Sequence, residues 1–393
     1  MTIAAKIEQS LVKSSWIRKM FEQGAALKAE HGSENVFDFS LGNPNLSPPD
    51  EFQSALEKVA SSRDRWVHGY MPNSGFPFVR ESIAENIRKE QSAEVTADDI
   101  IITCGAAGGL NVIFKALLNP GDEVLVSSPF FVEYSFYAEN HGGVLKTVPS
   151  KDDFTLNIEA VEAAITKNTR VILINSPNNP TGQIYSAKSL DELGTVLRKK
   201  SHEYGKVIYL VSDEPYRKIV FDNVTVPPVF KCYNESIVAT SHSKDLSLPG
   251  ERIGYLAINP EAEYRDKLRQ AMTLTNRILG FVNAPAIMQR VLPMIQGASV
   301  DIGAYKRKRD IFCKGLSDAG YDFVTPPGAF YLFPRSPIED DVEFVRALLD
   351  ELILAVPGSG FGAPGYFRLA FCVEDETIIK SIPAFKRVIQ RFV

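Results

Sequence analysis

Short apolar segments alternate with longer amphipathic segments through the middle of the chain, and this alternation restricts the possible folds more than any other feature. The strand-like segments cover residues 99–103, 123–128, 143–148, 170–176, 206–212, 236–241 and 252–259. Helical patterns fill most intervals between them, over residues 107–118, 130–140, 158–166 and 187–204. Strands that are apolar throughout and separated by helices are typical of a parallel sheet covered on both faces. We therefore expect an α/β fold with a mostly parallel, seven-stranded sheet sandwiched by helices.

Two further features bear on domain organisation. Segment 252–259 follows the preceding strand after a turn too short for a helical crossover, which predicts one antiparallel strand. Beyond residue 260 the pattern turns to helices with a few short strands, as in a small α+β domain. A chain of 393 residues has room for two or three domain-sized units. We expect a large domain over residues 41–290 and a small α+β domain over 291–393, with the N-terminal arm and helix over 1–40 as part of the small domain.

Composition excludes several classes of partner. The formal net charge is −5 and no long basic block occurs, which argues against nucleic acid or an anionic membrane as the main partner. No apolar run approaches the length of about 18 residues that a membrane span needs, and the N-terminus lacks a signal-peptide pattern. The four cysteines are far apart and the five histidines lack metal-ligand spacing. We expect a cytoplasmic protein without disulfides or a bound metal.

Four polar or small-residue segments each follow a predicted strand. They are "CGAAGGL" after 99–103, "PNNPTG" after 170–176, "DEPY" after 206–212 and "HSKDLSLPGER" after 236–241. Each has a simple structural explanation, such as close helix packing, a turn, a helix cap or a lysine that reaches solvent. In open parallel sheets, however, ligands bind beyond the carboxyl ends of the strands. The arrival of all four segments at one edge therefore favours a binding site.

Lys244, at the end of a buried strand, is the most unusual residue of this group. A lysine amine can attack an aldehyde only when it is deprotonated, and burial or a nearby cation lowers its pKa. Asp213 is suited to keeping a pyridine nitrogen protonated, which makes the ring an electron sink. Tyr216 and Asn179 could reach a hydroxyl on that ring. Phe131 could stack on the ring face, although a core aromatic is an equally good explanation.

The remaining residues of the group suit a phosphate. The N–H groups of Gly105, Ala106 and Ala107 open a predicted helix, where anions bind. Ser241 and Arg252 would share the same phosphate. The four segments together therefore indicate a pyridine cofactor that carries a phosphate.

The segments "NSPNNPTG", "SDEPY" and "SHSKDLSLPGERIGY" also carry a family resemblance. From "SLGNPN" (40–45) to "GYFRLAFC" (365–372), the chain resembles the fold-type I aminotransferases of class I and II, the aspartate aminotransferase-like family, which depend on pyridoxal 5′-phosphate. The resemblance implies that Lys244 forms the Schiff base with the cofactor and moves the proton during catalysis. It implies cofactor contacts from Asp213, Tyr216, Asn179, Phe131, Gly105, Ala106, Ala107, Ser241 and Arg252.

The resemblance also implies a substrate site and a partner. Arg368 matches an arginine that binds the substrate α-carboxylate, and Gly42 and Asn179 match contacts near it. Tyr70 matches a tyrosine that reaches the phosphate of the neighbouring subunit, so a homodimer with shared sites is expected. Some aspartate-specific relatives carry a lysine where Ala107 stands, and its absence weakens the case for aspartate. Arg277 could replace that lysine, but an arginine on a helix surface explains it better.

The function expected is amino-group transfer between an L-amino acid and a 2-oxo acid by a ping-pong route. A C–S or β-elimination lyase of the same fold is the alternative, because the same chemistry can expel a leaving group. A cofactor-binding regulator would need a DNA-binding domain before the fold, and 40 residues leave no room for one. A nicotinamide dehydrogenase would need GxGxxG, which "CGAAGGL" does not match.

Overall fold

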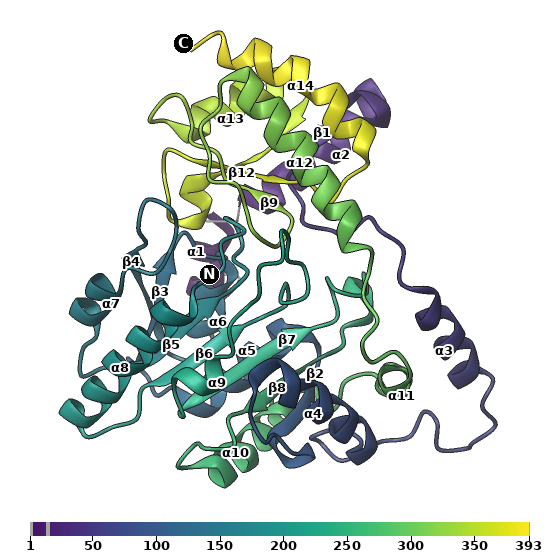
Figure 1. Cartoon of the computed structure of the whole chain (residues 1–393), viewed down its shortest axis with the longest axis vertical. Coiled ribbons are helices and arrows are strands. Elements are labelled where there is room, and N and C mark those ends of the chain that lie inside the picture. Colours follow the sequence, from purple (N-terminus) through teal and green to yellow (C-terminus); the bar gives the residue numbers. More distant parts are fainter. Residues whose placement is uncertain (1–2, 13–15, 393) are drawn as a thin grey trace.

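A mixed sheet of seven strands forms the centre of the computed structural model, which describes residues 3–12 and 16–392 (Figure 1). The strand order is β2-β8-β7-β6-β5-β3-β4. The strands are β2 (Ile100–Thr103), β3 (Glu123–Ser128), β4 (Val144–Pro149), β5 (Thr169–Asn175), β6 (Tyr209–Asp213), β7 (Ser236–Ser241) and β8 (Gly254–Ile258). Only β8 is antiparallel to its neighbours, β7 and β2. The expected sheet and its one antiparallel strand are therefore confirmed.

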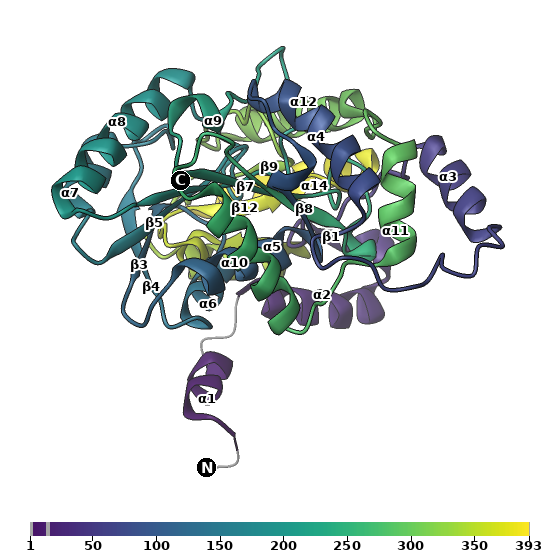
Figure 2. The same cartoon turned by 90° about the horizontal axis from the view of Figure 1, so that it is seen from below.

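Side chains of successive strand residues point to opposite faces, and both faces of this sheet are apolar. Ile172 packs into one buried core and its neighbour Leu173 into the other. Burying a side chain of this size stabilises the fold by about 1.5–3 kcal/mol, so helices must cover both faces. Figure 2 shows α4, α8 and α9 on one side of the sheet and α5, α6 and α10 on the other.

The helices on the first side are α3 (Asp50–Ala60), α4 (Pro77–Gln91), α7 (Ile158–Ala164), α8 (Ala187–Tyr204), α9 (Val229–Cys232) and α11 (Ala286–Val291). Those on the second side are α5 (Gly105–Leu117), α6 (Glu133–Glu139) and α10 (Arg265–Ile278). Most element limits agree with the sequence pattern, but β6 begins at Tyr209 rather than at residue 206. The reason is that Gly205, in a left-handed conformation, and the N–H of Lys206 are used to end α8.

A third apolar core combines residues from both ends of the chain. Strand β1 (Phe37–Asp38) pairs in parallel with β10 (Ile353–Leu354). A small antiparallel sheet has the order β11-β12-β9, formed by β9 (Tyr331–Leu332), β11 (Val356–Pro357) and β12 (Phe367–Ala370). Helices α12 (Ile302–Ala319), α13 (Asp341–Asp350) and α14 (Asp375–Ile389) pack around it, at the top of Figure 1. The N-terminal helices are α1 (Ala5–Val12) and α2 (Trp16–His31). The domain boundaries given above stay predictions.

Three further observations concern the described part of the chain as a whole. None of its helices is both long and apolar enough to cross a membrane. Its His, Cys, Asp and Glu side chains form no group of three or more that could hold a metal ion. All four cysteines are free thiols.

Candidate active site

A cavity of about 340 Å³ lies beyond the carboxyl ends of the parallel strands, between the large sheet and the core formed by both chain ends. Segments that are distant in sequence meet in its wall, from Leu41 to Arg368. Of the site residues predicted from the sequence, the wall contains Gly42, Ala106, Ala107, Phe131, Asn179, Asp213, Tyr216, Ser241, Lys244, Arg252 and Arg368. The four segments that follow strands therefore do meet at one edge of the sheet. The roles of these residues stay predictions.

Lys244 lies in the turn that follows β7, and its amine faces the cavity. The Nζ atom donates a hydrogen bond to the carbonyl oxygen of Gly42 at 2.7 Å. It lies 5.5 Å from the ring centre of Phe330 and 6.0 Å from that of Tyr216. Burial lowers the pKa of Lys244 to about 8, and the positive charges of Arg368 and Arg252 contribute to this. At pH 7, about one molecule in ten would therefore carry a neutral, nucleophilic amine.

Asp213 is the last residue of β6, and it is buried. Its Oδ2 accepts a hydrogen bond from the Tyr134 hydroxyl at 2.6 Å, and its Oδ1 has no partner within the described chain. Burial raises the pKa of Asp213 to about 7, against the effect of the Tyr134 hydrogen bond. A buried oxygen without a partner is costly, which indicates a missing donor in the cavity. A cationic N–H at that position would lower the pKa again.

Small residues and a cation meet at another part of the wall, where α5 begins. Gly105 has φ = +71°, and a Cβ added to it would lie 3.0 Å from Nη2 of Arg252. Arg252 is exposed and donates one hydrogen bond from Nη1 to the Pro249 carbonyl oxygen at 2.9 Å. The Ser241 and Ser243 hydroxyls are 3.1 Å apart beside it. A helix N-terminus with an adjacent arginine is suited to an anion such as a phosphate.

Arg368 comes from the central strand of the small antiparallel sheet, and its side chain is 2% exposed. Its Nη1 donates to the Asn179 side-chain oxygen at 3.0 Å, and its Nη2 donates to the Ser40 carbonyl oxygen at 2.5 Å. The guanidinium lies 4.7 Å from the ring centre of Tyr331. No carboxylate pairs with it among the described residues, and Nε has no partner there. Arg368 is thus a buried cation without a counter-ion, which excludes a buried ion pair as its structural role.

Several residues of this site were not predicted from the sequence. The Tyr331 hydroxyl lies 2.8 Å from that of Tyr216, and a Cβ on Gly42 would come within 2.0 Å of the Tyr331 oxygen. Asn175 donates to the Asp213 carbonyl oxygen at 2.8 Å and accepts from the Asn179 N–H at 2.7 Å. Asn175 could have been recognised as a polar residue at the end of an apolar strand. Tyr331 lies in an aromatic segment of ordinary core composition and gave no such signal.

Three predicted residues need separate comment. Phe131 lines the cavity, with its ring perpendicular to that of Tyr134 at 5.5 Å between centres. Tyr70 is 93% exposed and lies outside this cavity, so its proposed contact with a neighbouring subunit stays a prediction. Arg277 is exposed on α10 and lines a different hollow, which agrees with a helix-surface arginine within one chain.

Comparison with known proteins identifies the family. The family model described as "Aminotransferase class I and II" matches residues 34–384. The chain belongs to the class I and II aminotransferases. A "Probable aspartate aminotransferase" of Methanocaldococcus jannaschii is 30% identical, over 96% of this chain and 98% of that protein. A "Probable aspartate/prephenate aminotransferase" of Thermus aquaticus is 32% identical, over 93% and 94% respectively.

Solved structures agree with this membership. The crystal structure of an aminotransferase from Eubacterium rectale has a TM-score of 0.97 and 38% identity, and covers 100% of this chain and 99% of its own. The fold of this aminotransferase, with its large mixed sheet and cavity, is therefore the family fold. As a member of the family the protein is a transaminase, and the alternative of a lyase is not favoured by these relatives.

Proposed function

We propose that this aminotransferase binds pyridoxal 5′-phosphate in the 340 Å³ cavity and moves an amino group between an L-amino acid and a 2-oxo acid. The observation that carries the proposal is a set of three groups in one wall. These are the partnerless Oδ1 of buried Asp213, the Lys244 amine with its lowered pKa, and the buried Arg368 cation, which has no counter-ion among the described residues. A pyridine N–H would donate to Asp213, an aldehyde would react with the Lys244 amine, and a substrate carboxylate would pair with Arg368. The residues present therefore fit the cofactor and an amino acid together.

The phosphate would lie where α5 begins. Its negative charge suits the N–H groups of Gly105, Ala106 and Ala107, together with Arg252 and Ser241. The near contact between Gly105 and Arg252 explains why a residue without a side chain stands there. Phe131, which lines the same cavity, would cover one face of the ring.

When bound, pyridoxal phosphate supplies an aldehyde for amine exchange and a ring that accepts electrons. Asp213 would hold the ring nitrogen protonated through Oδ1. Tyr134 donates a hydrogen bond to its carboxylate, and Asn175 donates one to its carbonyl oxygen. Lys244, with its lowered pKa, would act as nucleophile in the resting enzyme and as general base and acid at the substrate Cα. Tyr216 and Asn179 would donate to the ring oxygen.

Arg368 would bind the substrate α-carboxylate, with Gly42 and Asn179 beside it. The hydrogen bonds of Arg368 to Asn179 and Ser40 fix the plane of the guanidinium before substrate arrives. A fixed, buried guanidinium gives a bidentate contact with a carboxylate and so orients the Cα–H bond relative to Lys244.

We also propose a homodimer in which Tyr70 reaches the phosphate of the neighbouring subunit. In support, Tyr70 is exposed, as are the apolar side chains of Trp66 and Ile278. Asn276 of α10 donates a hydrogen bond to the Asn73 carbonyl oxygen, so these exposed residues come from segments that contact each other. An exposed group of this kind is typical of a subunit interface.

The experiment that tests the proposal begins with the amino donor. The relatives are named for aspartate and prephenate, whereas Ala107 itself supplies no cation for a distal carboxylate. A panel of amino acids should be incubated with the holoenzyme and a 2-oxo acid, and the new amino acid measured. Borohydride reduction and peptide mapping should find the cofactor on Lys244. Pyruvate and ammonia as products, or a label on another lysine, would contradict the proposal.

A further inference from the structure

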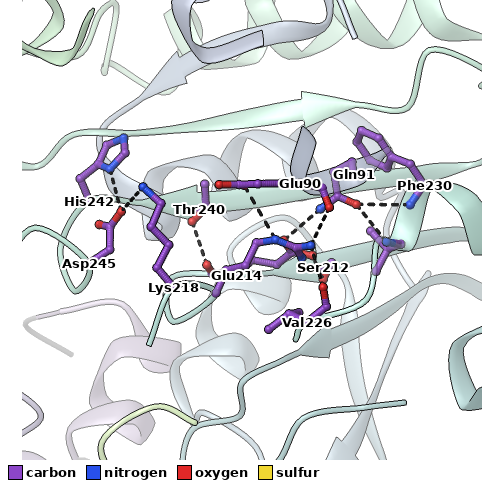
Figure 3. A network of polar contacts seen from close by, with 12 residues as sticks. Glu90, Gln91, Ser212, Glu214, Lys218, Val226, Phe230, Thr240, His242 and Asp245 are labelled. Carbon is purple, nitrogen blue, oxygen red and sulfur yellow. Dashed lines mark hydrogen bonds and ion pairs between the residues drawn. The ribbon is translucent and has the colours of Figure 1, made fainter. Parts of the chain in front are cut away.

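Two buried carboxylates stand directly beside the proposed catalytic residues without facing the cavity. Glu214 follows Asp213, and Asp245 follows Lys244. Figure 3 shows a network of polar contacts in two parts that no drawn contact joins. Glu214 lies in one part, with Glu90 and Gln91 from the end of α4, and Asp245 lies in the other. Since neither carboxylate touches the cavity, the proposed reaction gives them no direct role.

The first part of the network fixes the turn that begins at Asp213. The Glu214 carboxylate accepts hydrogen bonds from Ser212 at 2.8 Å, Arg217 at 2.9 Å and Gln91 at 3.1 Å. The Glu214 carbonyl oxygen accepts from the Thr240 hydroxyl of β7 at 2.9 Å. Every polar atom of the Glu214 side chain is therefore satisfied, and the start of the turn is held on three sides.

The second part of the network consists of Lys218, His242 and Asp245, which we call the Asp245 cluster. Asp245 is 5% exposed, and its Oδ2 lies 3.2 Å from the Lys218 amine and 3.3 Å from Nδ1 of His242. Burial alone would raise the pKa of this carboxyl, but His242 and Lys218 hold it below its usual value. The Asp245 carbonyl oxygen also accepts from the Val300 N–H at 2.8 Å. The Lys244 turn is thus held at Asp245 twice, through the side chain to Lys218 and through the carbonyl oxygen to Val300.

The Asp245 cluster joins two turns that the sheet itself does not hold together. The parallel pairing of β6 with β7 ends where Asp213 lies opposite Ala239. Beyond this point, the Lys218–Asp245 ion pair connects the turn of Tyr216 to the turn of Lys244. Lys218 is two residues from Tyr216, and Asp245 is adjacent to Lys244. A shift of either partner would therefore change the position of a proposed catalytic group.

We propose that Lys218, His242 and Asp245 are positioning residues, which set the Lys244 amine relative to Asp213 and Tyr216. This inference rests on the proposed function. Stability is a poor explanation for the cluster, because replacing a buried ion pair by apolar residues is often neutral or stabilising. Precise placement is a better one, since a displacement of about 1 Å at a reacting centre can reduce rate by about 100-fold.

The test compares the Asp245 cluster with a matched ion pair elsewhere. Asp99 is 1% exposed, pairs with Arg265 and precedes β2 at the opposite end of the sheet. Asp245→Asn and Asp99→Asn thus each remove one buried negative charge. The measurements are melting temperature, and kcat and KM of the holoenzyme with its best donor. We expect Asp245→Asn to lower kcat by about 10- to 100-fold with KM changed less, and Asp99→Asn to keep kcat within about twofold.

Two further variants keep the test decisive if Asp245→Asn does not fold. Lys218→Met removes the ion pair with Asp245 and should lower kcat in the same way, while Lys218→Arg keeps the positive charge and should retain most of the kcat of the unmodified enzyme. If both Lys218 variants keep full kcat, or if kcat falls only as far as in Asp99→Asn, the Asp245 cluster is structural and the inference is wrong. If the unmodified holoenzyme transfers no amino group from any donor, the proposed function fails, and the positioning role fails with it.

Discussion

Replacing Arg368 by lysine tests the substrate site most directly, because this arginine is a buried cation without a carboxylate partner in the described chain. The guanidinium already donates to Asn179 and Ser40, and a bidentate contact would use its remaining N–H groups. Lysine keeps the charge but presents one ammonium in place of a planar fork. It cannot satisfy Asn179, Ser40 and a carboxylate in the same geometry.

The expected loss follows from this difference. A hydrogen bond to a charged group contributes about 1.5–3 kcal/mol, and a two-point contact exceeds one such bond. Arg368→Lys should therefore cost at least about 2.7 kcal/mol, which is about 100-fold in kcat/KM for every amino acid donor. The assay is steady-state transamination with several donors, together with the visible absorbance of the bound cofactor, which should change little.

The decisive comparison uses an amine substrate that lacks a carboxylate, whose slow reaction should be nearly unaffected. If amine and amino acid lose rate equally, Arg368 does not bind the carboxylate and the reasoning is refuted. Arg309→Lys is the matched control, because Arg309 is also buried but pairs with Asp222 and Asp310 at 2.6 Å each. In Arg309→Lys, the ratio of the reaction rate with an amino acid to the rate with the amine should equal that of the unmodified enzyme.

Three other predictions concern the cofactor. Asp213→Ala should retain the fold and lower kcat by about 10²–10³-fold, since it removes the charge opposite the ring nitrogen; near-normal kcat would show that Asp213 only caps a turn. Capture of pyridoxal phosphate by apoprotein should accelerate as pH rises to about 8 and then level off, because Lys244 must be neutral; a pH-independent rate would exclude this amine. Tyr70→Phe should weaken cofactor binding by about tenfold in a protein that sediments as a dimer; a fully active monomer would contradict the shared site.

The sequence predicts the sheet well because burial on both faces leaves a strong pattern. Segments such as 170–176 have a continuous apolar run, here residues 171–174, and the groups that follow them reach one edge whatever the details of packing. Lys244, Asp213 and Asn179 could therefore be identified from their places after strands. Arg368 and Gly42 came from the family resemblance alone, since nothing in their local pattern separates them from core and turn residues.

Contacts between distant segments could not be predicted from the sequence. Tyr134 reaches Asp213, and Tyr331 reaches Tyr216, across 79 and 115 residues respectively. Neither tyrosine has a local pattern that distinguishes it from a core aromatic. The Asp245 cluster is similar, because Lys218 and Asp245 lie after different strands and their pairing depends on how two turns meet. Such contacts depend on side-chain direction, which strand and helix patterns do not determine.

The meeting of both chain ends at one cavity has a consequence for biosynthesis. Ribosomes make the chain from its N-terminus, so Gly42, Asp213 and Lys244 all emerge well before Arg368. At a synthesis rate of about 5–20 residues per second, roughly ten seconds separate Lys244 from Arg368. The amine that we propose bonds the cofactor therefore exists in the nascent polypeptide before the arginine that we propose binds the substrate carboxylate. A chain whose synthesis stops within that interval lacks β12, and it therefore contains Lys244 without Arg368.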